Sequence, residues 1–219
     1  MAKLVVFGAG DIARLAHFYF STDSNHEVVG FAVDGEYRTG PEFQGLPLVA
    51  VEELPQRFPP SGFKMFVALS YAKMNRIRAD KYAQMKALGY ELVSYVSTRC
   101  SYLSQHKPGD NCFILEDNTV QPYVTIGNDV TLWSGNHIGH DSTIGDHCFI
   151  SSHVVVSGHV DVGPSCFIGV NATLRNSISI GERTLIGAGA AIMKSTLPGS
   201  VYPGPRAERL AKTSDQLDF

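Results

Sequence analysis

The 219-residue chain lacks the features that mark several large classes of protein. It has four cysteines, none in a CxxC pair, and its 18 basic residues are scattered among 21 acidic ones, for a net charge of −3. A nucleic-acid surface needs concentrated lysine and arginine, which are missing here. The apolar run in MAKLVVFGAG is too short for a signal core or a membrane span and has no cleavage site. We therefore expect a cytoplasmic protein that binds neither nucleic acid nor a membrane.

The second half of the chain has an uninterrupted six-residue repeat instead. Aliphatic residues recur at Ile114, Val120, Ile126, Leu132, Ile138, Ile144, Ile150, Val156, Val162, Ile168, Leu174, Ile180, Ile186 and Ile192. A period of six fits neither a helix face nor a hairpin array, whereas hexapeptide repeats are typical of parallel β-helices. We predict a prism with three flat sides, one hexapeptide per side, in which residues eighteen apart stack in columns.

The fourth residue after each aliphatic residue is also expected to point into the prism, because it is small or apolar in most repeats. Cys112, Cys148 and Cys166 occupy one such column, which predicts core thiols rather than a disulfide or a metal site. Glycines that directly follow the aliphatic residue, such as Gly163 and Gly169, are expected at tight corners where a side chain would crowd.

The first half alternates strand and helix patterns up to about residue 98. Strands are expected at 3–10, 27–35, 46–51, 62–70 and 91–97, and helices at 11–20, 51–58 and 74–90, the last stopped by Gly89. This order predicts a small parallel α/β sheet. The segment is too short for both halves of a dinucleotide domain, which disfavours a hydride-transfer enzyme.

A glycine-rich turn, GAGDIA, links the first strand to the first helix. Gly8, Gly10 and Ala13 fill the three small positions of the dinucleotide fingerprint, and amides at the helix start can hold a phosphate. Asp34 follows the second strand, where a carboxylate can accept from a ribose or uridine group. The match is loose, and a tight strand-to-helix connection explains it equally well.

Five of the eight histidines fall between positions 137 and 159. Register places His140 third in its repeat and His147, His153 and His159 fourth, on three different corners, all pointing outward. His140 precedes Asp141, and a carboxylate beside an imidazole raises its basicity and fixes its tautomer. His159 follows Asp141 in its column at about 4.8 Å, so Asp141 can serve either ring. Polar capping of the corners is the alternative interpretation.

A zinc site must also be weighed, because histidine is a common ligand and β-helical carbonic anhydrases resemble this coil. His147, His153 and His159 point from three corners and cannot converge within one chain. Those enzymes also lack an N-terminal α/β domain. We therefore expect no metal cofactor.

The order of the two halves, with GAGDIA at the start, HDSTIG and CFIGVNATL in the coil and IGAGAAI near its end, resembles the sugar O-acyltransferase family over nearly the whole chain. That family includes sialic-acid O-acetyltransferases and bacterial N-acetyltransferases of nucleotide-linked amino sugars. The resemblance implies a left-handed β-helix that assembles into homotrimers. It also implies a first domain that binds the nucleotide sugar and acetyl-CoA between neighbouring coils.

The resemblance carries roles onto individual positions. It implies that the catalytic pair is His140 and Asp141. Contacts to acetyl-CoA, largely through backbone, fall on Val170 and Ala188. Substrate contacts fall on Gly8, Gly10, Asp11, Ile12, Asp34 and Ser70.

Three departures from the family pattern bear on the donor and the sugar more than on the reaction. The turn commonly reads SGH or GGH, and here it reads GDI. Phe149 stands where some members have a second coil histidine that contacts the acyl donor, and GPRA at 204–207 replaces the usual GxPA.

We expect a nucleotide-sugar-binding domain at 1–103, an acyltransferase coil at 104–198 and a tail at 199–219. The expected activity is acetyl transfer from acetyl-CoA to an amino or hydroxyl group of a nucleotide-linked sugar, for surface polysaccharide or glycoprotein synthesis. His140 would act as general base, Asp141 would orient it, and a backbone amide would stabilise the oxyanion. The alternatives are a noncatalytic nucleotide-sugar-binding scaffold and a β-helical zinc enzyme.

Overall fold

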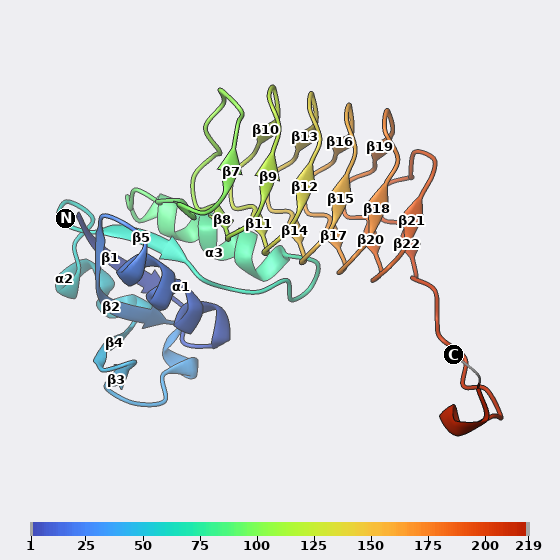
Figure 1. Ribbon diagram of the computed structural model, residues 1–219. Coiled ribbons are helices and arrows are strands. Elements are labelled where there is room, and N and C mark those ends of the chain that lie inside the picture. Colours follow the sequence, from blue (N-terminus) through green and yellow to red (C-terminus); the bar gives the residue numbers. More distant parts are fainter. Residues whose placement is uncertain (1, 218–219) are drawn as a thin grey trace.

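The computed structural model describes residues 2–217, which form an N-terminal α/β domain followed by a long three-sided coil (Figure 1). Its helices are α1 (Asp11–Thr22), α2 (Leu54–Arg57) and α3 (Arg76–Ala87), with 3₁₀ turns η1 (Gly35–Tyr37), η2 (Val51–Glu53) and η3 (Ser214–Gln216). No helix among the described residues combines the length and the apolar composition needed to span a membrane.

The sheet of the first domain is mixed. Its strands, in spatial order, are β3 (Glu42–Phe43), β4 (Leu46–Ala50), β2 (His26–Val33), β1 (Ala2–Phe7) and β5 (Lys64–Val67). The pairs among β4, β2, β1 and β5 are parallel, as expected, and an additional short strand, β3, pairs antiparallel with β4. Leu4 and Val6 of β1 pack toward α1, and Val5 and Phe7 pack toward α2 and α3, because side chains alternate along a strand.

The segment 91–97 does not form the fifth strand of this sheet, contrary to expectation. Only Leu92 makes a bridge, to Met65, and the chain then enters the coil as β6 (Tyr95–Val96). The reason is register: Val96 lies eighteen residues before Ile114, and β6 pairs in parallel with the strand that contains Ile114. The repeat therefore begins before the first residue of its aliphatic ladder.

The coil has three flat faces. The first face contains β6, β8 (Phe113–Ile114), β11 (Thr131–Leu132), β14 (Phe149–Ile150), β17 (Phe167–Ile168), β20 (Leu185–Ile186) and β22 (Val201–Tyr202). The second contains β7 (Ser101–Tyr102), β9 (Thr119–Val120), β12 (His137–Ile138), β15 (Val155–Val156), β18 (Thr173–Leu174) and β21 (Ala191–Ile192). The third contains β10 (Thr125–Ile126), β13 (Thr143–Ile144), β16 (Asp161–Val162) and β19 (Ser179–Ile180). The coil therefore begins before residue 104, with β6 and β7, and ends after residue 198, with β22.

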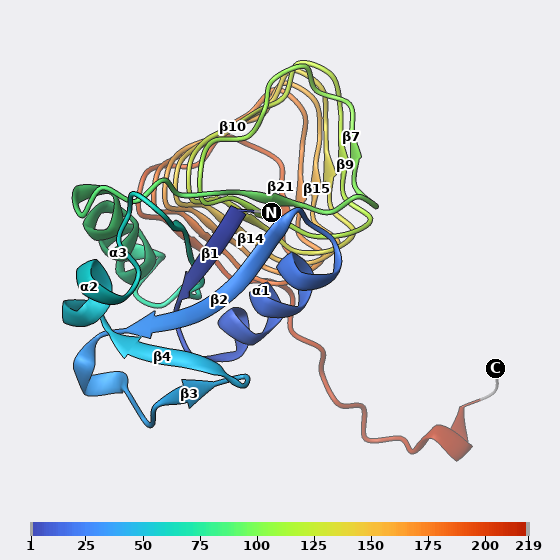
Figure 2. The same ribbon diagram turned by 90° about the vertical axis from the view of Figure 1, so that its left-hand side faces the viewer.

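Successive coils pair in parallel at the eighteen-residue spacing. In β11 and β14, for example, Leu132 lies opposite Ile150. All fourteen ladder aliphatics are buried. Figure 2 looks along the coil from its N-terminal end, and the chain passes from the second face to the third and then to the first in the anticlockwise sense as it recedes. The coil is therefore left-handed.

The corners turn at one left-handed residue in every repeat. Positive φ recurs every sixth position, at Asn111, Asp117, Tyr123, Asp129, Gly135, Asp141, His147, His153, His159, Ser165, Asn171, Ser177, Arg183 and Gly189. Asn, Asp and His tolerate this conformation best among residues with side chains. The glycines that directly follow the aliphatic residue lie just before these turns, and the crowding expected there is confirmed: a Cβ on Gly169 would lie 2.6 Å from the Ala188 nitrogen of the next coil.

The expected column of core thiols is present. Cys112, Cys148 and Cys166 are buried and free, and each thiol donates to the carbonyl of a glycine in the next part of the coil. Burial raises the pKa of the Cys112 thiol to about 12 and that of Cys148 well above its usual value. These two thiols are therefore poor nucleophiles.

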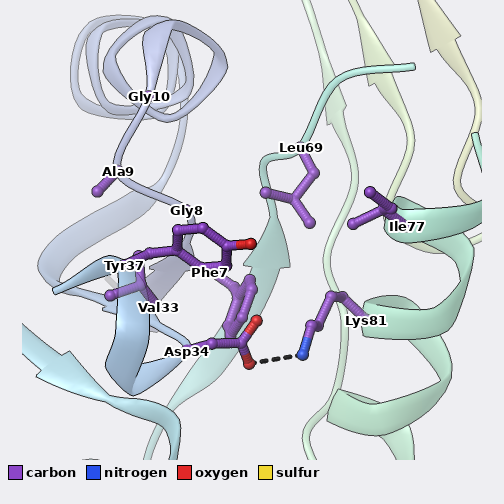
Figure 3. Close-up of a pocket in the computed structure, with 10 residues that line it drawn as sticks. All are labelled: Phe7, Gly8, Ala9, Gly10, Val33, Asp34, Tyr37, Leu69, Ile77 and Lys81. Carbon is purple, nitrogen blue, oxygen red and sulfur yellow. Dashed lines mark hydrogen bonds and ion pairs between the residues drawn. The ribbon is translucent and has the colours of Figure 1, made fainter. Parts of the chain in front are cut away.

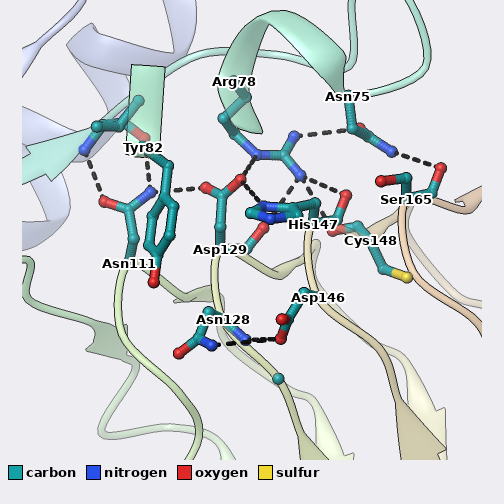
Figure 4. A network of polar contacts seen from close by, with 12 residues as sticks. Asn75, Arg78, Tyr82, Asn111, Asn128, Asp129, Asp146, His147, Cys148 and Ser165 are labelled. Atoms are coloured by element: carbon teal, nitrogen blue, oxygen red, sulfur yellow. Dashed lines mark hydrogen bonds and ion pairs between the residues drawn. The ribbon is translucent and has the colours of Figure 1, made fainter. Parts of the chain in front are cut away.

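A buried polar network fixes α3 to the corner between the third and first faces (Figure 4). The Arg78 guanidinium is 2% exposed and donates to the Asp129 carboxylate at 3.1 Å and to the carbonyls of Asp129, His147 and Cys148. Asn75 at the start of α3 adds hydrogen bonds to the carbonyls of Ser165 and Cys166. The α/β domain is thus attached to the coil by charge-assisted bonds that exclude water.

We predict that Arg78→Met lowers the free energy of unfolding by about 3–5 kcal/mol, because it leaves the buried Asp129 carboxylate without its cation. Thermal or urea unfolding measures the change. Arg76→Met is the matched control: Arg76 pairs with Asp80 at 3.8 Å on the same helix, but both side chains are about 70% exposed, so about 1 kcal/mol or less is expected. Equal losses in the two variants would contradict the assignment.

Candidate functional site

A cavity of about 420 Å³ opens where β1 and β2 end (Figure 3). It is lined by Phe7, Gly8, Ala9, Gly10, Val33, Asp34, Tyr37, Leu69, Ile77 and Lys81. The carboxyl ends of parallel strands are where open α/β sheets bind ligands. The volume lies within the usual range for small-molecule sites.

The glycine turn shapes the floor of this cavity. Gly8 has φ +133°, and a Cβ there would lie 2.7 Å from the Ala68 carbonyl oxygen, so the position requires glycine. Gly10 caps α1, and its side-chain direction is open, with nothing within 4 Å. Gly10, Asp11 and Ile12, at the start of this twelve-residue helix, border the cavities, and the start of a helix is a position that suits an anion.

Asp34 and Lys81 form an ion pair across the cavity. Lys81 Nζ lies 2.5 Å from Asp34 Oδ1, and it also lies 5.6 Å from the centre of the Phe7 ring. Asp34 was expected here from the sequence, but Lys81 was not. Lys81 reaches the cavity only because α3 packs against the coil through Arg78, one turn earlier, and no local sequence signal marks that contact.

A second cavity of about 340 Å³ adjoins the first and shares Gly10 and Leu69 with it. It is lined by Gly10, Asp11, Ile12, Ala68, Leu69, Ser70 and Tyr71. The six residues expected to contact substrate, Gly8, Gly10, Asp11, Ile12, Asp34 and Ser70, therefore line two adjoining cavities. Residues from three separate segments of the sequence, at 8–12, 34 and 70, therefore lie near one another.

His140 and Asp141 form a hydrogen-bonded pair at the corner between the second and third faces. His140 Nδ1 lies 2.8 Å from Asp141 Oδ2, with the side chains 52% and 42% exposed. An ionised carboxylate only accepts, so Nδ1 of the neutral ring carries the proton and Nε2 keeps a lone pair. The ring lies over Gly158 of the next coil, where a Cβ would come within 2.7 Å of Nε2.

His159 lies beside this pair, as its column position predicts. The rings of His140 and His159 meet edge to face with centroids 5.0 Å apart. Potential ligand atoms of His140, Asp141 and His159 all lie within 4.8 Å of one another. This trio differs from the one weighed from the sequence, His147, His153 and His159, whose members lie at three corners.

The other corner histidines have structural roles. His147 Nδ1 bonds to the buried Asp129 carboxylate at 2.8 Å, within the Arg78 network. His153 lies over Gly135, where a Cβ would contact its ring at 2.5 Å. Both residues, like His159, occupy left-handed positions that histidine tolerates. His140 does not, so backbone conformation does not explain its presence.

The His140 corner lies away from the α/β domain of the same chain. That domain packs on the first face, and Figure 2 shows the corner between the second and third faces projecting from the opposite side of the prism. Val170 and Ala188, expected to contact acetyl-CoA, are both exposed at the corner between the first and second faces. The amide of Gly189, the residue after Ala188, donates to the Val170 carbonyl at 2.8 Å, so Val170 and Ala188 lie on adjacent coils.

Comparisons with known sequences identify the repeat. Residues 123–158 match the family described as bacterial transferase hexapeptide (six repeats), and residues 159–194 match the hexapeptide repeat of succinyl-transferase. A stretch of 39 residues is 44% identical to the acyl-[acyl-carrier-protein]–UDP-N-acetylglucosamine O-acyltransferase of Burkholderia lata. That stretch is 18% of this chain and spans only 15% of the relative.

Solved structures extend the similarity beyond the repeat. The acetyltransferase domain of PglB from Neisseria gonorrhoeae superposes with a TM-score of 0.78 at 22% identity, covering 96% of this chain and 100% of that one. PerB from Caulobacter crescentus, solved with CoA and GDP-perosamine, gives 0.77 at 21% identity, covering 92% and 93%. Residues 123–194 are therefore similar to the hexapeptide repeats of bacterial transferases, and almost the whole chain shares the two-domain fold of these two structures.

Proposed function

We propose that the protein transfers an acyl group from acetyl-CoA to an amino or hydroxyl group of a nucleotide-linked sugar. The observation that carries this proposal is the His140–Asp141 pair, with its 2.8 Å bond and its free Nε2 on an exposed corner. The fold shared with PerB, whose structure contains CoA and GDP-perosamine, supports the choice of substrates. The boundaries at 103 and 198 are proposed as limits of function, since the strands of the coil themselves run from β6 to β22.

In the proposed reaction His140 Nε2 takes a proton from the sugar nucleophile as it attacks the thioester carbon. Asp141 holds the proton on Nδ1 and stabilises the imidazolium that forms. The carbon–sulfur bond then breaks, and the proton passes from His140 to the departing CoA thiolate. No acyl-enzyme is needed, which agrees with the buried thiols of the coil.

The two adjoining cavities of the α/β domain are the proposed site for the nucleotide sugar. The amides at the start of α1 would hold a phosphate, and the second oxygen of Asp34 would accept from the nucleoside. Lys81 adds a positive charge beside Asp34. Ser70 and Asp11, in the second cavity, would then face the sugar.

Two chains are needed to complete this site. Because the His140 corner points away from its own α/β domain, the sugar held by one chain must meet the His140 of a neighbour. A cyclic homotrimer would place each corner against the next chain, with acetyl-CoA along Val170 and Ala188 between coils. The trimer is a proposal that follows from this separation and from the family resemblance.

We predict that His140→Ala lowers kcat by about 10²–10⁴-fold, the usual contribution of a positioned base. Release of the CoA thiol, measured against a panel of nucleotide-linked amino and hydroxy sugars, provides the assay. Asp141→Asn should give a smaller loss, because the imidazole remains.

His106→Ala is the control, since that imidazole is exposed and has no carboxylate partner within residues 2–217, and it should keep full activity. Unchanged transfer in His140→Ala would exclude His140 as the base. If His159→Ala then abolished transfer, the base would be His159. If neither variant lost activity, the base would be another residue. Absence of transfer by the wild-type protein with every sugar tested would instead favour the noncatalytic scaffold.

The two-chain site can be tested by complementation. Gly10→Asp adds a carboxylate into open space at the start of α1 and should block phosphate binding without disturbing packing. His140→Ala and Gly10→Asp should each be inactive alone. Co-expressed, they should recover about a quarter of the sites, the fraction that random mixing gives when neighbouring chains share a site. No recovery would place the whole site within one chain.

A metal enzyme is the second candidate, favoured by the closeness of His140, Asp141 and His159. Two imidazoles and a carboxylate are suitable ligands for zinc. We expect acetyl transfer to survive removal of metal by EDTA. Loss of transfer on chelation, with recovery on adding Zn²⁺, would overturn the metal-free mechanism.

A further inference from the structure

A small apolar cavity lies between the α/β domain and the first face of the coil. Its volume is about 260 Å³, and it is lined by Ile12, Tyr71, Trp133, Phe149, Ser151, Ser152 and Val170. Its only side-chain polar atoms besides those of Tyr71 and Trp133 are the two serine hydroxyls, and Ser151 is 9% exposed. Neither the catalytic pair nor the nucleotide cavity uses this space.

Aromatic rings build its wall. Tyr71 meets Phe149 at 5.0 Å and Phe167 at 4.7 Å between ring centroids, and Phe149 stacks on Phe167 at 5.8 Å. Behind Phe149 lies the Arg78 guanidinium, 5.8 Å from the ring centre, which is itself fixed to the coil. The wall therefore has a rigid base, with the half-exposed Tyr71 as its outer edge.

The position of the cavity identifies its occupant. It shares Ile12 and Tyr71 with the cavity proposed for the sugar, and it is also lined by Val170, a proposed contact of the acyl donor. In the proposed reaction the acyl group is the part of the donor that must reach the sugar. An apolar space between the two substrates is where the alkyl chain of that group would lie.

We propose that this cavity binds the alkyl chain of the acyl donor and selects a chain longer than acetyl, of about four carbons. The inference rests on the proposed function and changes only the length of the acyl group that is transferred. The same thioester bond breaks and the same amide or ester bond forms. The hydrocarbon wall favours added methylenes because each one leaves water. We expect acetyl-CoA to serve as a donor and butyryl-CoA to be a better one.

The test compares acetyl-, propionyl-, butyryl- and hexanoyl-CoA with the wild-type protein. We expect kcat/KM to rise about fourfold for each methylene up to butyryl and to fall with hexanoyl. Tyr71→Ala removes the outer wall and should bring the butyryl-to-acetyl ratio close to one; because Tyr71 also lines the proposed sugar cavity, this ratio and not the absolute rate is the readout. Phe18→Ala, which removes a similarly exposed ring from α1, is the matched control and should leave the ratio unchanged.

Binding gives a readout that does not depend on turnover. Trp133 is the chain's one tryptophan and lines the cavity, so its fluorescence reports on occupation. Butyryl-CoA should shift the emission to shorter wavelength, and free CoA should not. The shift should be lost in Tyr71→Ala and kept in Phe18→Ala.

Several outcomes would overturn the inference. Acetyl-CoA as the best donor, or a chain-length ratio unaffected by Tyr71→Ala, would show that the alkyl chain lies elsewhere. A rise in the KM for the sugar in Tyr71→Ala with the chain-length ratio unchanged would assign the cavity to the sugar. Active acetyl transfer with no preference for longer chains refutes the inference but leaves the proposed function intact. Absence of transfer with every donor, together with no Trp133 response, refutes both.

Discussion

The eighteen-residue register between coils is the constraint on which the rest of this structure depends. Each strand of the coil is only two residues long, so no strand is stable without its neighbours above and below. The backbone amides pair with carbonyls one coil away, and the buried aliphatics stack in the same columns. Any side chain placed outside is therefore fixed relative to the residues eighteen positions before and after it, as His159 is beside Asp141.

This regularity explains why the coil could be predicted from sequence. A strict period determines which residues face inward, so the thiol column, the three faces and the closeness of Asp141 to His159 all followed from counting. The α/β domain has no such period. The antiparallel pairing of Glu42–Phe43 and the transfer of Tyr95–Val96 to the coil depend on tertiary pairing that local pattern does not reveal. The crowding expected at the glycines that follow the aliphatic residues is confirmed, because a Cβ at these positions would meet the backbone of the next coil.

The candidate site was predictable to the extent that its residues lie on ends of strands or in columns. The glycine turn, Asp34 and the His140 pair were found in this way. Lys81, Tyr71 and Trp133 were missed because they meet their neighbours only after α3 and the segment before it dock onto the first face. That docking relies on Arg78, a charged residue on the buried side of a helix, where the amphipathic pattern predicts an apolar one.

The left-handed corner positions allow polar side chains to change while the fold of the coil stays the same. Because one position per repeat favours Asn, Asp or His for conformational reasons alone, polar and ionisable groups accumulate along the edges of the prism at little cost in stability. Exchanging the exposed ones leaves the hydrogen-bonded frame intact, whereas Asp129 and His147 belong to the buried Arg78 network. A coil of this kind can therefore acquire or lose a reactive edge by a few substitutions, so divergence among such proteins should concentrate along their edges while the interior stays the same.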